Sequence, residues 1–143
     1  MRFWDSSALV PLAVAETHSV ALTALAAEDP EMIVWWGSYV ECGSAVHRLR
    51  REGAFGAAEA LGLLATLSAL VGAANVVQPG EELSLSALRL LAAHPLRAAD
   101  ALQLAAATIW ARGRPAGHVF VSLDERLRTA ALLESFTVVP AAV

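Results

Sequence analysis

The sequence predicts a single α/β domain, with a mostly parallel sheet covered by helices on both faces. Short apolar segments alternate with longer helical patterns over all 143 residues, as in successive βαβ units. The composition is 57% hydrophobic and 17% charged, with a mean hydropathy of +0.54, which suits strands that are buried on both faces. No linker, repeat or low-complexity segment divides the chain, so residues 1–143 are expected to form one domain.

Each expected strand is a run of strand-forming residues with a turn-forming, acidic or polar residue within the next two positions. In chain order the strands are Arg2–Trp4, Met32–Trp35, Asn75–Gln78, Val119–Val121 and Thr137–Val139. The first run ends at Asp5, and either Ser6 or Ser7 is suited to cap the helix that follows.

Each expected helix has helical composition or spacing, and four of the six stop near a Gly or a Pro. In chain order these helices are Thr17–Ala27, Ser38–Arg51, Phe55–Val71, Glu81–Ala93, Ala98–Arg112 and Asp124–Leu133. Pro30 follows the first of them, Gly53 the second, Pro95 the fourth and Gly113 the fifth.

The charged residues are unevenly distributed by type. All ten basic residues are Arg, and fourteen acids give a net charge of −4. Only four Asp occur, of which Asp29 belongs to an ordinary turn before Pro30. Nucleic-acid binding normally needs a basic track, so metal ions would have to supply part of the positive charge at an RNA site here.

Several cellular locations are disfavoured by the sequence. No run of about 18 apolar residues is free of charge, so no membrane span is expected. Asp5 interrupts the chain before a secretory signal could form, and the single cysteine, Cys42, cannot form an internal disulfide. We therefore expect a protein of the reducing cytoplasm.

Four acids from separate segments are expected to meet at one edge of the sheet. Asp5 ends the first strand, Asp124 follows the fourth, and Asp100 and Glu41 lie near the starts of their helices. The carboxyl ends of parallel strands share one edge, where ligands gather. Each acid alone is compatible with a helix cap or a solvated residue, but together they would repel and need a counter-charge. An all-oxygen site suits Mg²⁺ or Mn²⁺, which can activate water against a phosphodiester.

Four motifs carry these acids in order: Trp4–Val10 (WDSSALV), Tyr39–Glu41 (YVE), Arg97–Ala105 (RAADALQLA) and Phe120–Asp124 (FVSLD). The ordered set resembles the PIN-domain ribonucleases, and most closely the VapC-type toxins of toxin–antitoxin pairs. The resemblance spans nearly the whole chain. It implies a three-layer α/β/α sandwich and an endoribonuclease that uses Mg²⁺ or Mn²⁺. It also implies a homodimer that is held inactive by a cognate antitoxin.

The resemblance maps Asp5, Glu41, Asp100 and Asp124 onto the acidic positions of the family. We expect Asp5 and Asp100 to bind metal directly, because a strand end and a helix start fix their positions most firmly. Glu41 is expected to act through water or as a base. Asp124 is expected to be an outer ligand or to hold a second metal.

Three accessory residues complete the expected site. Ser6 maps onto the hydroxyl beside the first acid and Ser122 onto the hydroxyl before the last, where each would orient water or cap a helix. Arg97, three residues before Asp100, would meet the acids or an RNA phosphate, and a surface ion pair is its alternative.

Two other functions are compatible with parts of the pattern. A phosphoaspartyl phosphatase also begins with an Asp at a strand end, but such enzymes use a Lys, and this chain contains none. A catalytically silent binding module with the same fold is the second alternative. Metal-dependent RNA cleavage separates it from a nuclease.

Overall fold

The sheet is fully parallel and has the strand order β3-β2-β1-β4-β5. The computed structural model describes residues 1–141. Its strands are β1 (Arg2–Trp4), β2 (Met32–Trp35), β3 (Asn75–Val77), β4 (Val119–Val121) and β5 (Thr137–Val139). Phe3 of the central strand pairs with Ile33 on one side and with Phe120 on the other. All five strands therefore end at the same edge of the sheet.

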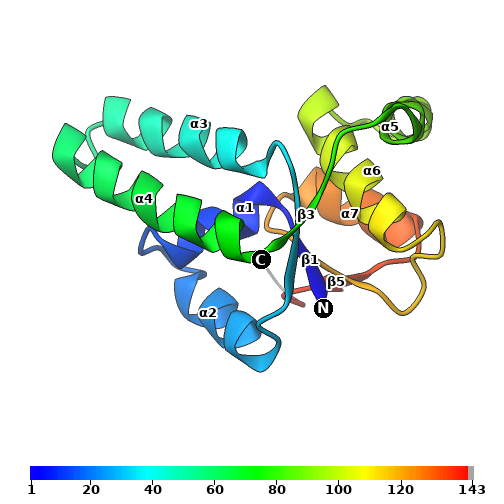
Figure 1. Cartoon of the computed structure of the whole chain (residues 1–143), viewed down its shortest axis with the longest axis horizontal. Coiled ribbons are helices and arrows are strands. Elements are labelled where there is room, and N and C mark those ends of the chain that lie inside the picture. The colour runs from blue at the N-terminus through cyan, green and yellow to red at the C-terminus, as the bar shows by residue number, and fades with distance from the viewer. Residues whose placement is uncertain (142–143) are drawn as a thin grey trace.

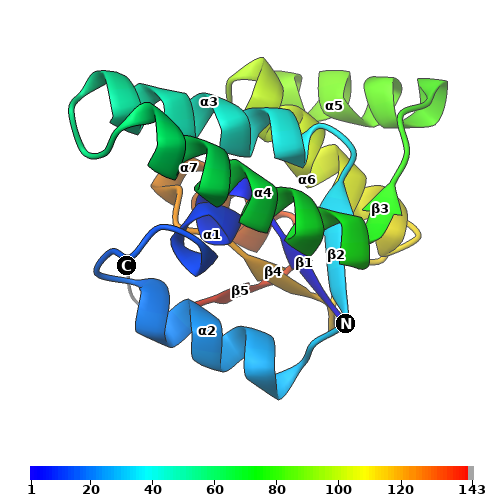
Figure 2. The ribbon, with the colours of Figure 1, turned by 60° about the vertical axis from the view of Figure 1, so that its left-hand side comes forward.

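The helices cover both faces of this sheet. They are α1 (Ser6–Leu9), the 3₁₀ turn η1 (Val10–Leu12), α2 (Ser19–Glu28), α3 (Ser38–Arg51), α4 (Ala57–Ala73), α5 (Glu81–Ala93), α6 (Ala98–Trp110) and α7 (Glu125–Leu133). Helices α1 to α4 lie on one face and α5 to α7 on the other (Figure 1). Figure 2 shows α3 and α4 running side by side. The predicted three-layer α/β/α sandwich is confirmed.

The core is split into two clusters because adjacent strand residues point to opposite faces. Phe3 packs with Ile33 and Phe120 under α5 to α7, whereas Trp4 packs with Val34 and Val121 under α1 to α4. Strands buried on both faces account for the apolar composition. None of the helices in residues 1–141 is both long and apolar enough to cross a membrane.

The predicted elements are all present, with local corrections. Asp5, and neither Ser6 nor Ser7, is the N-cap of α1, because its carboxylate accepts a hydrogen bond from the Ser7 amide. The fifth expected helix ends at Trp110 instead of Arg112, because Arg112 has a φ of 52° and leaves the helical conformation. Asp124 stands just before α7 as its N-cap.

Five other boundaries differ by one or two residues. The helix expected over Thr17–Ala27 spans Ser19–Glu28, and the helix expected over Phe55–Val71 spans Ala57–Ala73. The third strand ends at Val77, before Gln78. Helix and strand ends are the least sharply encoded parts of a sequence pattern, so shifts of this size leave the topology unchanged.

Candidate active site

An open cavity of about 610 Å³ lies beside the carboxyl ends of β1 and β4. Its lining includes all four of the predicted acids, Asp5, Glu41, Asp100 and Asp124. They come from the end of β1, from α3, from α6 and from the residue before α7. The structure therefore brings together four carboxylates that are spread over 119 positions of the sequence, from 5 to 124.

Asp5 is the most deeply buried of these acids, with 3% of its surface exposed. Its Oδ1 accepts a hydrogen bond from the backbone N–H of Ser7 at 2.8 Å, and its Oδ2 accepts one from Ser7 Oγ at 2.6 Å. Burial raises the pKa of Asp5. Hydrogen bonds from Ser122 and Ser7 lower it in part, and the charge of Asp124 raises it further. The backbone of Asp5 also donates to Val121 O at 3.1 Å, which fixes the acid between β1 and β4.

Ser6 connects Asp5 to Glu41. Its hydroxyl lies 2.8 Å from Glu41 Oε2 and 3.3 Å from Asp5 Oδ1. Because a hydroxyl has a single proton, it can donate to only one carboxylate at a time, and the shorter distance favours Glu41. Burial raises the pKa of Glu41, hydrogen bonds from Ser6 and Gln103 lower it in part, and the charges of Asp5 and Asp100 raise it.

Asp100 and Asp124 are both held at helix starts. Asp100 lies in the first turn of α6, where it accepts a 3.3 Å hydrogen bond from the backbone N–H of Arg97. Partial burial and the charge of Asp124 raise its pKa, against the lowering effect of that hydrogen bond and of the Arg97 charge. Asp124 accepts a 2.8 Å hydrogen bond from the backbone N–H of Leu127 and so caps α7.

The donor set at this edge suits a hard divalent cation, since it consists of carboxylate and hydroxyl oxygens. Burial raises the pKa of Asp5, Glu41 and Asp100, and in each case the charge of a nearby acid raises the pKa further. Within residues 1–141, however, no three Asp, Glu, His or Cys side chains are grouped so that they could hold one ion. Each carboxylate is instead turned toward its own local donors. The residues fit Mg²⁺ in the form it usually takes, with one or two carboxylates and several waters.

Comparisons with known proteins show what this architecture resembles. No protein-family model and no curated protein sequence matches the chain. VapC20 of Mycobacterium tuberculosis, a toxin that cleaves the sarcin–ricin loop, superposes with a TM-score of 0.67 at 19% identity, over 91% of this chain and 95% of that one. FitAcB of Neisseria gonorrhoeae gives 0.69 at 12% identity, over 98% and 97%. PAE2754 of Pyrobaculum aerophilum gives 0.67 at 18% identity, over 96% and 87%.

The chain has the PIN-domain fold of the VapC-type proteins. Both chains of each pair are covered almost end to end, so the likeness includes the whole domain and not one βαβ unit. At identities of 12–19% the shared property is the fold. The predicted resemblance is confirmed at this level.

Ser7 is a residue of the PIN-domain site whose importance the sequence did not reveal. Its Oγ donates to Asp5 and accepts a 2.8 Å hydrogen bond from the backbone N–H of Leu123. Ser122 lies behind it with its side chain fully buried. The Ser122 hydroxyl lies 3.4 Å from Ser7 Oγ and accepts from the Asp124 N–H at 3.1 Å. The two serines therefore link Asp5, at the end of β1, to the loop after β4 that carries Asp124.

Gln103 is a second residue that sequence analysis missed. It is 1% exposed and donates a 3.1 Å hydrogen bond to Ser38 Oγ, which joins α6 to the start of α3. Its side chain also lowers the pKa of Glu41, against the larger raising effect of burial. The available signal was a polar residue three positions after Asp100, on the same side of an otherwise apolar helix.

Among the arginines, Arg48 and Arg97 line the carboxylate cavity. Arg97 takes part in no ion pair within residues 1–141, so the predicted alternative of a surface ion pair is not what this structure contains. Arg128 has a different task, because its guanidinium donates to the backbone oxygens of Ser122 and Pro140 at 2.6 and 2.7 Å. It anchors the loop after β4, which carries Asp124.

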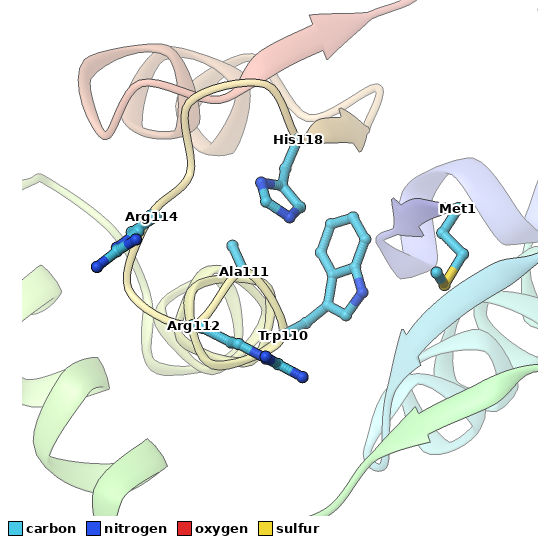
Figure 3. Close-up of a pocket in the computed structure, with 6 residues that line it drawn as sticks. All are labelled: Met1, Trp110, Ala111, Arg112, Arg114 and His118. Carbon is cyan, nitrogen blue, oxygen red and sulfur yellow. The ribbon is translucent and has the colours of Figure 1, made fainter.

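A larger cavity of about 890 Å³ lies at the other end of α6. It is lined by Met1, Trp110, Ala111, Arg112, Arg114 and His118. Figure 3 shows Arg112 and Arg114 extending in different directions from the end of the helix, with the His118 and Trp110 rings next to each other. No Asp or Glu of residues 1–141 lines this cavity, and its guanidinium groups diverge. The smaller cavity is therefore the candidate active site.

Proposed function

We propose that this PIN-domain chain is a metal-dependent endoribonuclease whose active site is the carboxylate cavity. The observation that carries the proposal is the convergence of Asp5, Glu41, Asp100 and Asp124 on one cavity at the carboxyl edge of the sheet. The pKa values of Asp5, Glu41 and Asp100 are raised, chiefly by burial and further by the charge of a neighbouring acid. A bound divalent cation would stabilise the charged form of these acids.

In this proposal Asp5 and Asp100 hold Mg²⁺ or Mn²⁺, and Glu41 and Asp124 act through bound water. The ion, when bound, supplies a water of lowered pKa and stabilises negative charge on the phosphate. Ser6 donates to Glu41 and lies beside Asp5, and Ser7 donates to Asp5 and contacts Ser122. The Arg97 side chain, exposed on the cavity wall, offers its guanidinium to an RNA phosphate.

The biological role that we propose is that of a toxin in a toxin–antitoxin pair. The resemblance to VapC-type toxins supports this role, together with a homodimer, a cognate antitoxin and a cytoplasmic location. Large apolar side chains that remain exposed are consistent with protein partners; they include Trp36 at 57%, Val40 at 70% and Leu133 at 71%. Expression with and without the adjacent reading frame tests the role, because harmless expression of the active enzyme alone would contradict it.

Cleavage assays with purified protein test the nuclease proposal. Wild type should cleave RNA with Mg²⁺ or Mn²⁺, and Asp5→Asn should lose at least about a hundredfold in rate, because a metal ligand is replaced. Asp29→Asn is a matched control, since Asp29 is the one Asp of the sequence that does not line the cavity. Normal cleavage by Asp5→Asn would contradict the proposed site.

A catalytically silent RNA-binding protein is the second candidate. It is favoured by one observation, the absence of any group of three potential metal ligands within residues 1–141. Such a protein would bind RNA in the same cavity and leave it intact at any metal concentration. A phosphoaspartyl enzyme is disfavoured because such enzymes use a Lys to bind the phosphoryl group, and the chain contains none.

A further inference from the structure

The carboxylate cavity extends along one face of α3. The residues of this helix that line it are Glu41, Ser44, Ala45, Arg48 and Leu49. Their spacing of three, four, seven and eight positions from Glu41 is that of one helical face. At 1.5 Å per residue, Arg48 stands about 10 Å further along the helix than Glu41. The cavity therefore has an acidic end and, two helical turns away, an end that carries a guanidinium.

The charges of the residues that line the cavity indicate why its Arg48 end would be important for binding RNA. Within residues 1–141, five acids line the cavity, the four described above and Glu16, against two arginines. One of the two, Arg97, lies at the acidic end beside Asp100. Even with a divalent cation bound, the cavity would keep a net negative charge. An RNA strand leaving the acidic end then meets one remaining cation on the cavity wall, the guanidinium of Arg48.

The guanidinium of Arg48 is available for such a contact. Its side chain is 64% exposed, and its one ion pair within residues 1–141 is with Glu52 at 3.9 Å. The Glu52 side chain is 60% exposed as well. An exposed pair of this length contributes little to stability, so Arg48 can leave Glu52 at small cost. A guanidinium can also bind two phosphate oxygens at once. Its contact with Glu52 is a single long one, so an RNA phosphate would be the stronger partner.

We propose that Arg48 binds an RNA phosphate about three nucleotides from the scissile bond, given a rise of about 3.4 Å per nucleotide in a stacked strand. This proposal rests on the proposed nuclease function and adds to it a direction for the substrate, from the acids along α3. Arg48 binds substrate and takes no part in bond cleavage. Its contribution is to affinity and to the placement of the strand.

Binding measurements in the Asp5→Asn background, with a short fluorescein-labelled single-stranded RNA of mixed sequence, test the proposal. Arg48→Ala should weaken binding about tenfold, as expected for one charge-assisted contact, and should reduce the slope of log affinity against log salt by about 0.7. Arg48→Lys should keep most of that slope, because it keeps the charge. Arg51→Ala is the matched control, since Arg51 lies on the same helix but does not line the cavity.

Equal affinities and salt slopes for Arg48→Ala and Arg51→Ala would overturn the proposal. Unchanged thermal unfolding of both variants shows that the fold is intact. In the wild-type background, Arg48→Ala should raise KM and leave kcat unchanged. Its effect should vanish for substrates trimmed to fewer than about three nucleotides on one side of the cut. If Arg48→Ala raises KM on every trimmed substrate as well, the position assigned to Arg48 along the RNA is contradicted.

The two proposals fail in different ways. If wild type binds RNA without cleaving it, the nuclease proposal fails, and the comparison of Arg48→Ala with Arg51→Ala still decides whether Arg48 binds phosphate. If wild type cleaves RNA and both arginine variants behave alike, the nuclease proposal stands and the assignment of Arg48 fails. If wild type neither binds nor cleaves RNA, both proposals are contradicted.

Discussion

Ser7 Oγ donates a 2.6 Å hydrogen bond to Oδ2 of Asp5. The same hydroxyl accepts from the backbone N–H of Leu123, so it links the loop after β1 to the loop after β4. The position of the most buried acid in the cavity therefore depends on a residue that touches both loops. Metal-binding and catalytic carboxylates generally need such supporting contacts to stay in a productive orientation.

Ser7→Ala tests this support. The substitution leaves the Leu123 N–H without its partner and frees one oxygen of Asp5. We expect the free energy of unfolding to fall by about 1–3 kcal/mol, the usual effect of an unsatisfied buried donor, and RNA cleavage to fall as well. Denaturant unfolding measures the first effect. Ser44→Ala, at a cavity-lining serine whose side chain makes no hydrogen bond within residues 1–141, should change stability by less than about 0.5 kcal/mol.

Two substitutions of Asp124 can distinguish its structural role as a helix cap from a role in RNA cleavage. Its carboxylate caps α7, and Asn caps a helix about as well as Asp. Asp124→Asn should therefore keep the stability of wild type but lose cleavage, if the charge serves the reaction. Asp124→Ala should in addition lose about 1 kcal/mol of stability. Full activity of Asp124→Asn would show that Asp124 is only a cap.

Neutralising Asp5 should stabilise the metal-free protein. Burial raises the pKa of this acid in the folded state, so its charged form opposes folding above that pKa, and the opposition is relieved as the pH falls. Asp5→Asn removes the charge at every pH and should raise the Tm at pH 7 by a few degrees. Added Mg²⁺ should raise the Tm of wild type and not that of Asp5→Asn. A lower Tm for Asp5→Asn than for wild type, both measured in chelator, would contradict the conclusion that the charge of Asp5 opposes folding.

The contribution of Glu134 to the stability of the fold should have the opposite pH dependence to that of Asp5. Hydrogen bonds from Arg89 at 2.8 Å, and its contact with His94 at 2.7 Å, hold its pKa below the ordinary value of 4.5. Its contribution is therefore complete above pH 4.5 and is lost as the pH falls through the lowered pKa. Glu134→Gln should cost about 1 kcal/mol at pH 7, a modest figure because Arg89 is half exposed. The difference from wild type should disappear in strongly acidic solution, and a constant difference at all pH values would argue against this ion pair.

The layers and the order of elements could be predicted from the sequence because short runs of strand-forming residues alternate with longer helical segments. The boundaries of β2, α3, α5 and β5 match the predicted ranges. The end of α6 did not match, since apolar and helix-forming residues continue to Arg112 although Arg112 itself takes a positive φ. A helical pattern does not encode the residue at which the backbone reverses.

The four acids of the candidate site were predictable because each ends a strand or begins a helix, and parallel strands bring those positions to one edge. The residues that hold these acids in place could not be predicted from the sequence. Ser7 and Leu123 are 116 positions apart, and Gln103 and Ser38 are 65 apart. A single sequence has no signal that pairs such residues, since hydrogen bonds between distant loops leave no period. Arg48 was missed because it is an ordinary member of the charged end of α3 until the cavity beside it is known.

Metal dependence of RNA cleavage is the most direct test of the central claim. The purified wild type should lose all cleavage when divalent ions are removed by a chelator, and excess Mg²⁺ or Mn²⁺ should restore it. Cleavage that continues unchanged in chelator, or no cleavage of RNA at any concentration of either metal, would contradict a metal-dependent nuclease site built from these four carboxylates.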